Sequence, residues 1–479
     1  MSISRNAIAV IFYTFSCLLL LISSILSWLD SWIYFNLIIL LISSLMVAFF
    51  SLIVSGNIFS ILFIFISFWI LYGLSGPVAV VFGIDFPDIF PKPYLVSYFL
   101  LHFSLGSVGL ISGILAGFLC LRPSLRSSNE KASQSFLVLC ALVFSFLALF
   151  FELVNFTRAG GIEAVLSGKA AYQSAISELT ATLPTQVVAT AAFAFLGLIF
   201  SKRRDGKIWL FICTMVLFPA ISVSIVLGQR GAILTYGMAF FIGVFYERPL
   251  SKLRLKLISA ALIAYVFMGF IYGLRASAWR EISNNFGAGL TLIVEKIQSV
   301  KFWASSLNPG SNEFGAPFGN FNTYVVSGGK AAVKWGETYL NGLTIIVPRF
   351  IWPDKPISAT YEFRDAFFPF EAERGQIAGT AYSSILEAYT NFGSIGVLIV
   401  FGIFGLFLIT LEKLKARFQG IVYFTFYVMF VTFSIWSHRS ALEFPLFWPL
   451  VMAACAYTLL LWWRSIGVGR PQMRQLRNA

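Results

Sequence analysis

The sequence predicts an all-α polytopic membrane protein, because hydrophobic residues dominate it and occur in long unbroken runs. Hydrophobic residues make up 58% of the 479 residues, and charged residues only 11%. The runs are roughly twenty residues long, the length at which a helix crosses a bilayer. Backbone groups inside a bilayer must bond to one another, and barrel strands would alternate polar and apolar residues instead. The runs are therefore expected to be transmembrane helices.

About twelve such helices are expected along the chain. They cover residues 7–28, 32–54, 57–75, 95–121, 135–154, 184–201, 208–227, 232–246, 257–274, 393–411, 419–437 and 443–463. The first run follows a short leader with Arg5 and is too long for a signal-peptide core, so we interpret it as an uncleaved span. Residues 1–479 are expected to form a single membrane domain.

Short basic connectors predict the orientation of these spans. They contain Arg122, Arg126 and Lys131; Lys202, Arg203, Arg204 and Lys207; Arg248, Lys252, Arg254 and Lys256; Lys413, Lys415 and Arg417; and, in the tail, Arg464, Arg470, Arg474 and Arg477. All fall on one side under this span count, and Lys and Arg accumulate on the cytoplasmic side. Both termini are therefore expected in the cytoplasm. Since topology accounts for much of the net charge of +13, no nucleic-acid partner is expected.

The opposite side should carry a large loop region at 275–391, inserted between the ninth and tenth spans. This region is too long for a simple connector and is expected to fold against the bundle. An apolar stripe inside it has the spacing of an amphipathic helix, and it consists of Phe286, Leu290, Ile293, Ile297 and Val300. Packing onto the bundle or lying in the lipid interface would both cover this stripe, and packing is preferred.

The turn Gly228-Gln229-Arg230-Gly231 interrupts two apolar runs and leaves Arg230 near the membrane surface. A planar, permanently charged guanidinium suits a phosphate group, and the two glycines would let the backbone approach a ligand closely. The alternative is an arginine at a helix end whose head group reaches water. The phosphate-binding interpretation is preferred.

Residues 347–356, with the sequence Val-Pro-Arg-Phe-Ile-Trp-Pro-Asp-Lys-Pro, form a second candidate segment in the large loop. Three prolines fix φ and reduce the entropy that the segment loses on ordering. Arg349 and Lys355 would then be in place before a substrate arrives. The alternative is a stiff loop whose charges only face water.

A third candidate lies at 387–393, where Glu-Ala-Tyr-Thr-Asn-Phe-Gly opens the tenth span shortly after Tyr382. Glu387 is expected to have a raised pKa through desolvation unless an arginine offsets it. Either case suits a proton acceptor or a positioning group. A carboxylate favoured by the helix dipole is the equally weighted alternative.

Further cations are expected on the same side as the large loop. The turn Ser437-His438-Arg439-Ser440 places Arg439 near the surface, while His438 alone would normally be solvated. Arg275 and Arg280 begin the large loop, where each can also simply anchor a helix end.

No metal or cofactor is expected. Asp85 and Asp88 flank Pro87 in a pattern that fits an ordinary turn, and the two histidines of the chain, His102 and His438, form no cluster. There is also no Walker-type glycine loop and no Gly-x-Ser-x-Gly elbow.

Together these motifs resemble the Wzy-type O-antigen polymerase family of bacterial inner membranes. The resemblance rests on the turn at 228–231, the block at 348–356, the stretch at 387–393 and Arg439. It covers the C-terminal half of the chain, because the first six spans match only in being hydrophobic. It implies a bundle like that of the C-class (GT-C) membrane glycosyltransferases. It also implies metal-independent action on oligosaccharides linked to undecaprenyl diphosphate, at the periplasmic face.

The implied reaction transfers the growing glycan from undecaprenyl diphosphate onto a new lipid-linked repeat unit, as in lipopolysaccharide biosynthesis. Charge on the departing diphosphate must be stabilised and an acceptor hydroxyl deprotonated. The expected diphosphate ligands are Arg230, Arg349 and Arg439, helped by Arg280 and Lys355, with Glu387 as proton acceptor. Arg275, Tyr382 and His438 complete the expected substrate-binding set. The lipid bilayer, a chain-length regulator and a flippase are the expected partners.

Two other functions fit the same topology. An O-antigen ligase would resemble this chain but relies on a histidine in the large outer loop, and residues 275–391 contain none. A flippase or other transporter of lipid-linked oligosaccharides should show polar residues at mid-membrane and short outer loops. The charges here crowd into one large loop, which favours the polymerase.

Overall fold

The computed structural model describes most of the chain, and its described residues form helices joined by turns, with no β-strand among them. The described residues are 5–27, 32–82, 93–121, 133–167, 172, 185–202, 205–227, 229–247, 263, 266–267, 270, 281, 285–307, 314–327, 334–344, 347, 351–369, 381–418 and 420–466. The predicted all-α polytopic fold class is therefore confirmed.

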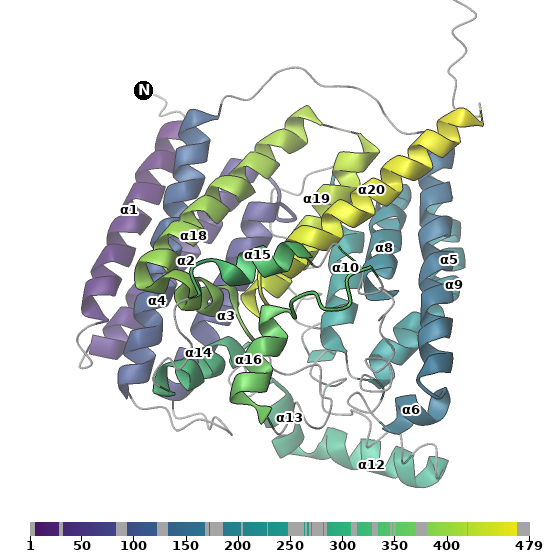
Figure 1. Ribbon diagram of the computed structural model, residues 1–479, viewed down its shortest axis with the longest axis horizontal. Coiled ribbons are helices and arrows are strands. Elements are labelled where there is room, and N and C mark those ends of the chain that lie inside the picture. The colour runs from purple at the N-terminus through teal and green to yellow at the C-terminus, as the bar shows by residue number, and fades with distance from the viewer. Residues whose placement is uncertain are drawn as a thin grey trace, which may run out of the picture.

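Within the described residues, eleven long helices form the bundle; Figure 1 shows their arrangement. They are α1 (Arg5–Leu26), α2 (Ile33–Ser55), α3 (Ile61–Val81), α4 (Pro93–Cys120), α5 (Gln134–Arg158), α8 (Thr185–Lys202), α9 (Gly206–Val226), α10 (Arg230–Phe245), α18 (Ser384–Arg417), α19 (Ile421–Ser434) and α20 (Glu443–Ser465). Each coincides with a predicted span, and the remaining predicted span, 257–274, lies largely outside the described residues. Eight helices in the described part are long and apolar enough to cross a membrane. The total of about twelve spans stays a prediction.

Shorter helices come mainly from the large loop region. They are α6 (Ile162–Ser167), α12 (Phe286–Gln298), α13 (Val300–Leu307), α14 (Ala316–Val326), α15 (Glu337–Leu343), α16 (Ala359–Phe367) and the 3-10 helix η3 (Ile435–His438). In Figure 1, α14 and α16 lie towards the end of the bundle opposite the N-terminus, and α15 lies beside α20. α14 inserts Phe318 and Phe321 against Phe99 of α4, so this part of the loop region is folded against the bundle, as expected.

Serine caps set the start of several helices. Ser60, Ser133 and Ser383 each accept a hydrogen bond from a backbone N–H in the first turn of α3, α5 and α18. α18 is interrupted at Gly393, where φ is 67° and ψ is −160°. A positive φ is easily adopted only by glycine. The motif at 387–393 therefore forms a short helical segment before the long part of α18.

Glycines allow α4 and α18 to pack with their backbones in close contact. Gly109, Gly113 and Gly117 recur every fourth residue on α4 and face α18. A Cβ at Gly109 or Gly113 would collide with a backbone oxygen of α18, that of Leu398 or Gly402. Small residues at this spacing let transmembrane helices approach closely.

The basic connectors gather at one end of the bundle where the structure describes them. Lys202 at the end of α8 forms an ion pair with Glu247, with 2.6 Å between Nζ and Oε1. Lys413 near the end of α18 donates a hydrogen bond to the carbonyl of Gly117 at 2.9 Å. The motifs of interest lie at the other end, called here the site end, where α5 ends and α8, α10, α18 and α20 begin.

The amphipathic helix predicted around Leu290 exists as α12, but its apolar stripe does not pack onto the bundle. Leu290, Ile297 and Val300 are 45%, 41% and 82% exposed. α12 runs crosswise to α5 at the edge of the molecule (Figure 1). The preferred expectation of packing was therefore wrong for most of this stripe. Its alternative, the lipid interface, remains as the environment that would cover these residues.

Replacing Gly113 by alanine should destabilise the fold. The added methyl group would force α4 and α18 apart, at a cost of about 1–3 kcal/mol. Thermal unfolding of the purified protein in detergent should show a lower transition temperature. The matched control is Gly237→Ala in α10, where an added Cβ has no atom within 4 Å and no loss is expected. Equal behaviour of the two variants would contradict the close packing.

A spin label at position 294 should lie in lipid, and one at position 295 in water. Val294 is exposed beside the apolar stripe on the same side of α12, whereas Glu295 is exposed on the polar side. Val294→Cys and Glu295→Cys, each in a background without the native cysteines, would be labelled in proteoliposomes. We expect position 294 to be more accessible to oxygen and position 295 to a water-soluble nickel complex. Similar accessibility at both positions would exclude the lipid interface.

Candidate functional site

Glu387 is buried at the site end, and both of its carboxylate oxygens accept hydrogen bonds. It lies in the first segment of α18 and is 1% exposed. Oε1 accepts from the Thr338 hydroxyl of α15 at 2.9 Å, and Oε2 accepts from the backbone N–H of Leu442 at 2.8 Å. A buried carboxylate needs such donors to replace water. Glu387 thereby joins α15, α18 and the start of α20.

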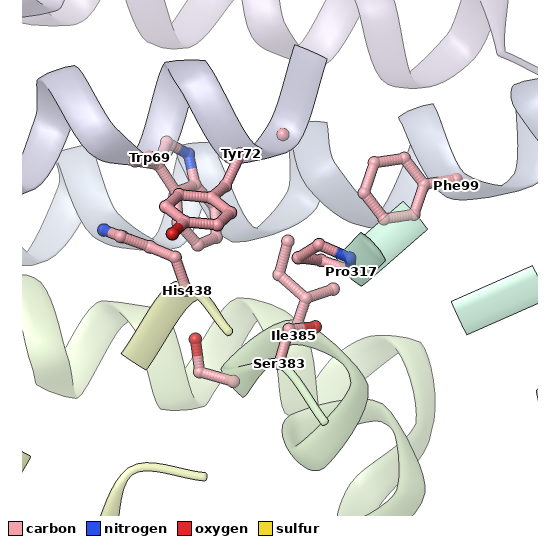
Figure 2. Close-up of a pocket in the computed structure, with 9 residues that line it drawn as sticks. Trp69, Tyr72, Phe99, Pro317, Ser383, Ile385 and His438 are labelled. Atoms are coloured by element: carbon pink, nitrogen blue, oxygen red, sulfur yellow. The ribbon is translucent and has the colours of Figure 1, made fainter. Parts of the chain in front are cut away.

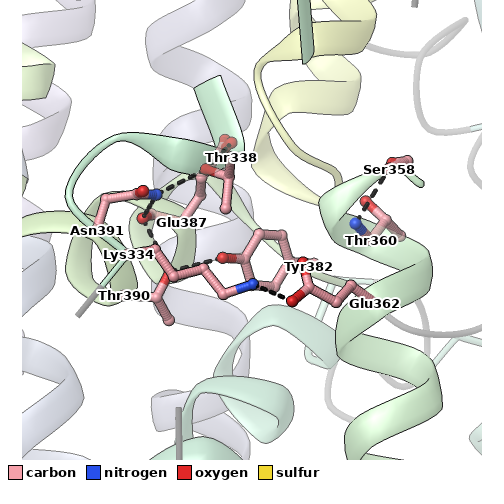
Figure 3. Close-up of polar contacts among 9 residues, drawn as sticks. All are labelled: Lys334, Thr338, Ser358, Thr360, Glu362, Tyr382, Glu387, Thr390 and Asn391. Carbon is pink, nitrogen blue, oxygen red and sulfur yellow. Dashed lines mark hydrogen bonds and ion pairs between the residues drawn. The ribbon is translucent and has the colours of Figure 1, made fainter. Parts of the chain in front are cut away.

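Asn391 strengthens the same junction (Figure 3). Its Nδ2 donates to the Thr338 hydroxyl at 2.7 Å, and its Oδ1 accepts from the Gly336 N–H at 2.9 Å. The N–H groups of Lys334 and Trp335 donate to the carbonyls of residues 390 and 391, both at 3.1 Å. Trp335 has a φ of 48°, which is uncommon for a residue with a side chain. The segment 334–336 is thus fixed onto the first turns of α18.

Tyr382 belongs to the same network rather than to an open surface. It is buried, its hydroxyl lies 2.6 Å from the Thr390 Oγ1, and its ring packs against Phe363 of α16 with centroids 5.2 Å apart. Burial raises the pKa of the Tyr382 phenol, so the group stays neutral. Beside it, Lys334 and Glu362 form an ion pair that ties the segment before α15 to α16 (Figure 3).

His438 is buried among aromatic rings, which corrects the expectation of a solvated side chain. It is 3% exposed, and its ring centroid lies 4.5 Å from that of Phe65 and 5.7 Å from that of Tyr72. It borders a small cavity with Trp69, Tyr72, Ser383 and Ile385 (Figure 2). The free volume of about 10 Å³ is at the lower limit for one water molecule and far too small for a sugar.

The backbone segments that carry Arg230 and Arg439 both lie next to Trp436. Arg230 is the first residue of α10 and is only 8% exposed. The neighbouring Gly231 has no room for a side chain, because a Cβ there would collide with the Trp436 ring. Arg439 donates its backbone N–H to the Trp436 carbonyl at 2.9 Å. The start of α10 and the turn before α20 therefore lie side by side at Trp436.

Lys355 closes the proline-rich segment on itself. Its Nζ donates to the carbonyl of Val347 at 2.8 Å, and its N–H donates to that of Trp352 at 3.3 Å. These two bonds join Val347, Trp352 and Lys355 within the described part of the segment. The remaining predicted site residues, Arg275, Arg280 and Arg349, lie outside the described residues, as do Asp85 and Asp88. Among the described residues, no group of three or more potential ligands could hold a metal.

Two polar groups of the site end were missed from the sequence. Nothing in the sequence around Thr338 indicates a functional role, because a threonine in a long loop is common. Glu152 could have been found, since a carboxylate inside a predicted span is a functional candidate by itself. It is 6% exposed in α5 and accepts a hydrogen bond from the Tyr172 hydroxyl at 3.2 Å.

Replacing Thr338 by valine should loosen the junction between α15 and α18. The buried Glu387 carboxylate would lose one donor, at a cost of about 1–3 kcal/mol. We expect a lower thermal transition and faster proteolysis within the large loop region. Thr338→Ser keeps the hydroxyl and is the matched control. If valine and serine variants resisted protease equally well, the Thr338–Glu387 bond would not hold the loop.

Comparison with known proteins gives a match, and it includes residues of the site end. No curated protein and no solved structure matches the chain. The model of the family O-antigen polysaccharide polymerase Wzy matches residues 371–465. That segment contains Tyr382, Glu387, the turn at 437–440 and α20. Over these residues the chain is therefore similar to the O-antigen polysaccharide polymerase Wzy family, as the stretch at 387–393 and Arg439 predicted.

Proposed function

We propose that this protein is an oligosaccharide repeat unit polymerase of the membrane. The family match over residues 371–465 carries this proposal, because it includes the Glu387 junction and the turn with Arg439. The substrate would be a glycan linked to undecaprenyl diphosphate. The enzyme would transfer the growing glycan onto a new lipid-linked repeat unit, and the acceptor hydroxyl would displace the diphosphate without a metal.

Arginines are proposed to stabilise the leaving diphosphate. A cation at the first residue of α10 opposes the positive end of the helix dipole, and a bound anion would offset this cost. The N–H groups at such a helix start also favour an anion, and the Gln229 side chain does not cap them. Arg230, whose neighbour Gly231 packs against the Trp436 ring, and Arg439, whose N–H bonds to the Trp436 carbonyl, would share the diphosphate. Arg349 is proposed to join them, with Arg275, Arg280 and Lys355 assisting.

Glu387 is proposed to act as a positioning residue. Its carboxylate is engaged by Thr338 and by the N–H of Leu442, so it holds α15 and the start of α20 in place. Leu442 lies three residues beyond Arg439 in the chain. The junction would thus fix the turn that carries Arg439, while Tyr382 and His438 would support the same end from within.

The orientation follows from the basic end of the bundle. Lys and Arg accumulate on the cytoplasmic side, so the site end would face the periplasm and both termini the cytoplasm of a bacterial inner membrane. The helices α14, α15 and α16 would then cover the sugars at the outer face. A chain-length regulator and a flippase remain the expected partners.

Synthesis by the purified protein tests the function directly. Synthetic repeat units on undecaprenyl diphosphate should give a ladder of glycan lengths with no second protein present. A flippase would give no ladder, and a ligase would require a lipid A core acceptor. Absence of any product from folded, membrane-inserted protein would overturn the polymerase proposal.

Within that assay, Arg230→Gln should reduce the rate by about 10²–10³-fold, the usual loss when one donor to a developing negative charge is removed. Arg230→Lys should keep part of the activity because it keeps the charge. Arg464→Gln at the exposed far end of α20 is the control and should behave as wild type. A normal ladder from Arg230→Gln would refute the role of Arg230.

A further inference from the structure

The proposed reaction needs a group that accepts the proton of the acceptor hydroxyl. Among the residues whose side chains the structure describes, Glu152 and Glu387 are the buried carboxylates. Glu387 is fixed by a threonine hydroxyl and by a backbone N–H, and the latter cannot turn away from it. Glu387 is therefore poorly placed to exchange a protein donor for a substrate hydroxyl.

Glu152 has a different environment, made of side-chain hydroxyl groups. Tyr172 donates to its Oε1 at 3.2 Å, and the Thr185 hydroxyl at the start of α8 lies near the carboxylate. Asn155, one turn along α5, donates from Nδ2 to the same Thr185 at 3.2 Å. Tyr236 of α10 lies close enough for its phenol to interact with the charge of Glu152. Hydroxyl donors can rotate, so one of them can give way to a substrate hydroxyl.

The elements that surround Glu152 also flank Arg230. Tyr172 packs with Leu227, which follows α9 directly and precedes the turn at 228–231. Tyr236 is six residues beyond Arg230 in α10, and Thr235 beside it accepts a hydrogen bond from Gln186 of α8 at 3.3 Å. The carboxylate and the guanidinium thus belong to one group of helix ends, formed by α5, α8, α9 and α10.

We propose that Glu152 is the proton acceptor of the polymerase reaction and that the sugar hydroxyl of the acceptor takes the place of the Tyr172 hydroxyl. This inference rests on the proposed function. A rotation of the Tyr172 side chain would leave Oε1 of Glu152 free to accept a hydrogen bond from the sugar hydroxyl. A phenol O–H donating to this carboxylate has the same hydrogen-bonding chemistry as a sugar O–H in the same position.

The transfer replaces one bond at the anomeric carbon by another. The acceptor oxygen forms a bond to the anomeric carbon while its proton passes to Glu152. The bond between that carbon and the diphosphate oxygen breaks, and the electron pair leaves with the diphosphate, held by the arginines. The protonated Glu152 then releases its proton to water through the neighbouring hydroxyl groups. Tyr236 and Tyr172 are the titratable groups described around it, and both can stay neutral throughout.

Single-turnover synthesis by the full-length protein tests this role. Glu152→Gln keeps the size of the side chain and should lower the rate of transfer by about 10²–10⁴-fold. The affinity for the synthetic lipid-linked donor and the thermal transition should stay within twofold and a few degrees of wild type. Glu152→Asp should recover part of the rate, because it restores a carboxylate. Glu163→Gln in α6, an exposed carboxylate on the same side, is the matched control and should be fully active.

Two results would overturn the proposal while leaving the polymerase function intact. One is a ladder from Glu152→Gln at the wild-type rate. The other is a loss of donor affinity and thermal stability that matches the loss of rate, which would make Glu152 a structural residue. Failure of wild-type protein to form any ladder would instead refute the polymerase function itself.

Discussion

The site end depends on one constraint, that a carboxylate taken out of water must be fully hydrogen-bonded. Glu387 meets it with a hydroxyl from α15 and an N–H from the start of α20, so three segments far apart in the sequence have one possible arrangement around it. Asn391 and Tyr382 extend the network into the large loop region. In an apolar bundle, where shape alone distinguishes helices poorly, such polar contacts give the loop a defined position.

Much of the fold could be predicted because the bilayer permits few alternatives. Long apolar runs must be helices, and the basic connectors agree on one side, so α1, α5 and α20 lie where the hydropathy placed them. The environment of α12 could not be predicted in the same way. An apolar stripe at helical spacing predicts that the helix packs against an apolar environment. It does not distinguish the helix bundle from lipid, because both are apolar.

Only those residues of the candidate site could be predicted whose own charge and position in an apolar sequence indicate a function. Arg230 and Glu387 attracted attention because charges at apolar helix ends are costly. Their partners had no such signal. Thr338 lies 49 positions before Glu387, and the N–H of Leu442 is a backbone group that any residue except proline supplies. His438 was misjudged because a histidine in a short turn looks solvated, whereas the rings of α3 enclose it. Tertiary packing decides such cases.

The break in α18 has a mechanical consequence. A continuous helix would use the carbonyls of residues 390 and 391 internally, but the turn at Gly393 leaves them available, and the N–H groups of Lys334 and Trp335 occupy them. On the far side of the break, Ser394 bonds to His102 of α4, which holds the bend against its neighbour. Lifting the segment 334–336 would therefore leave two buried carbonyls without these donors unless the helix straightened at the same moment. Release of the segment 334–336 and straightening of α18 should therefore be a single coupled motion.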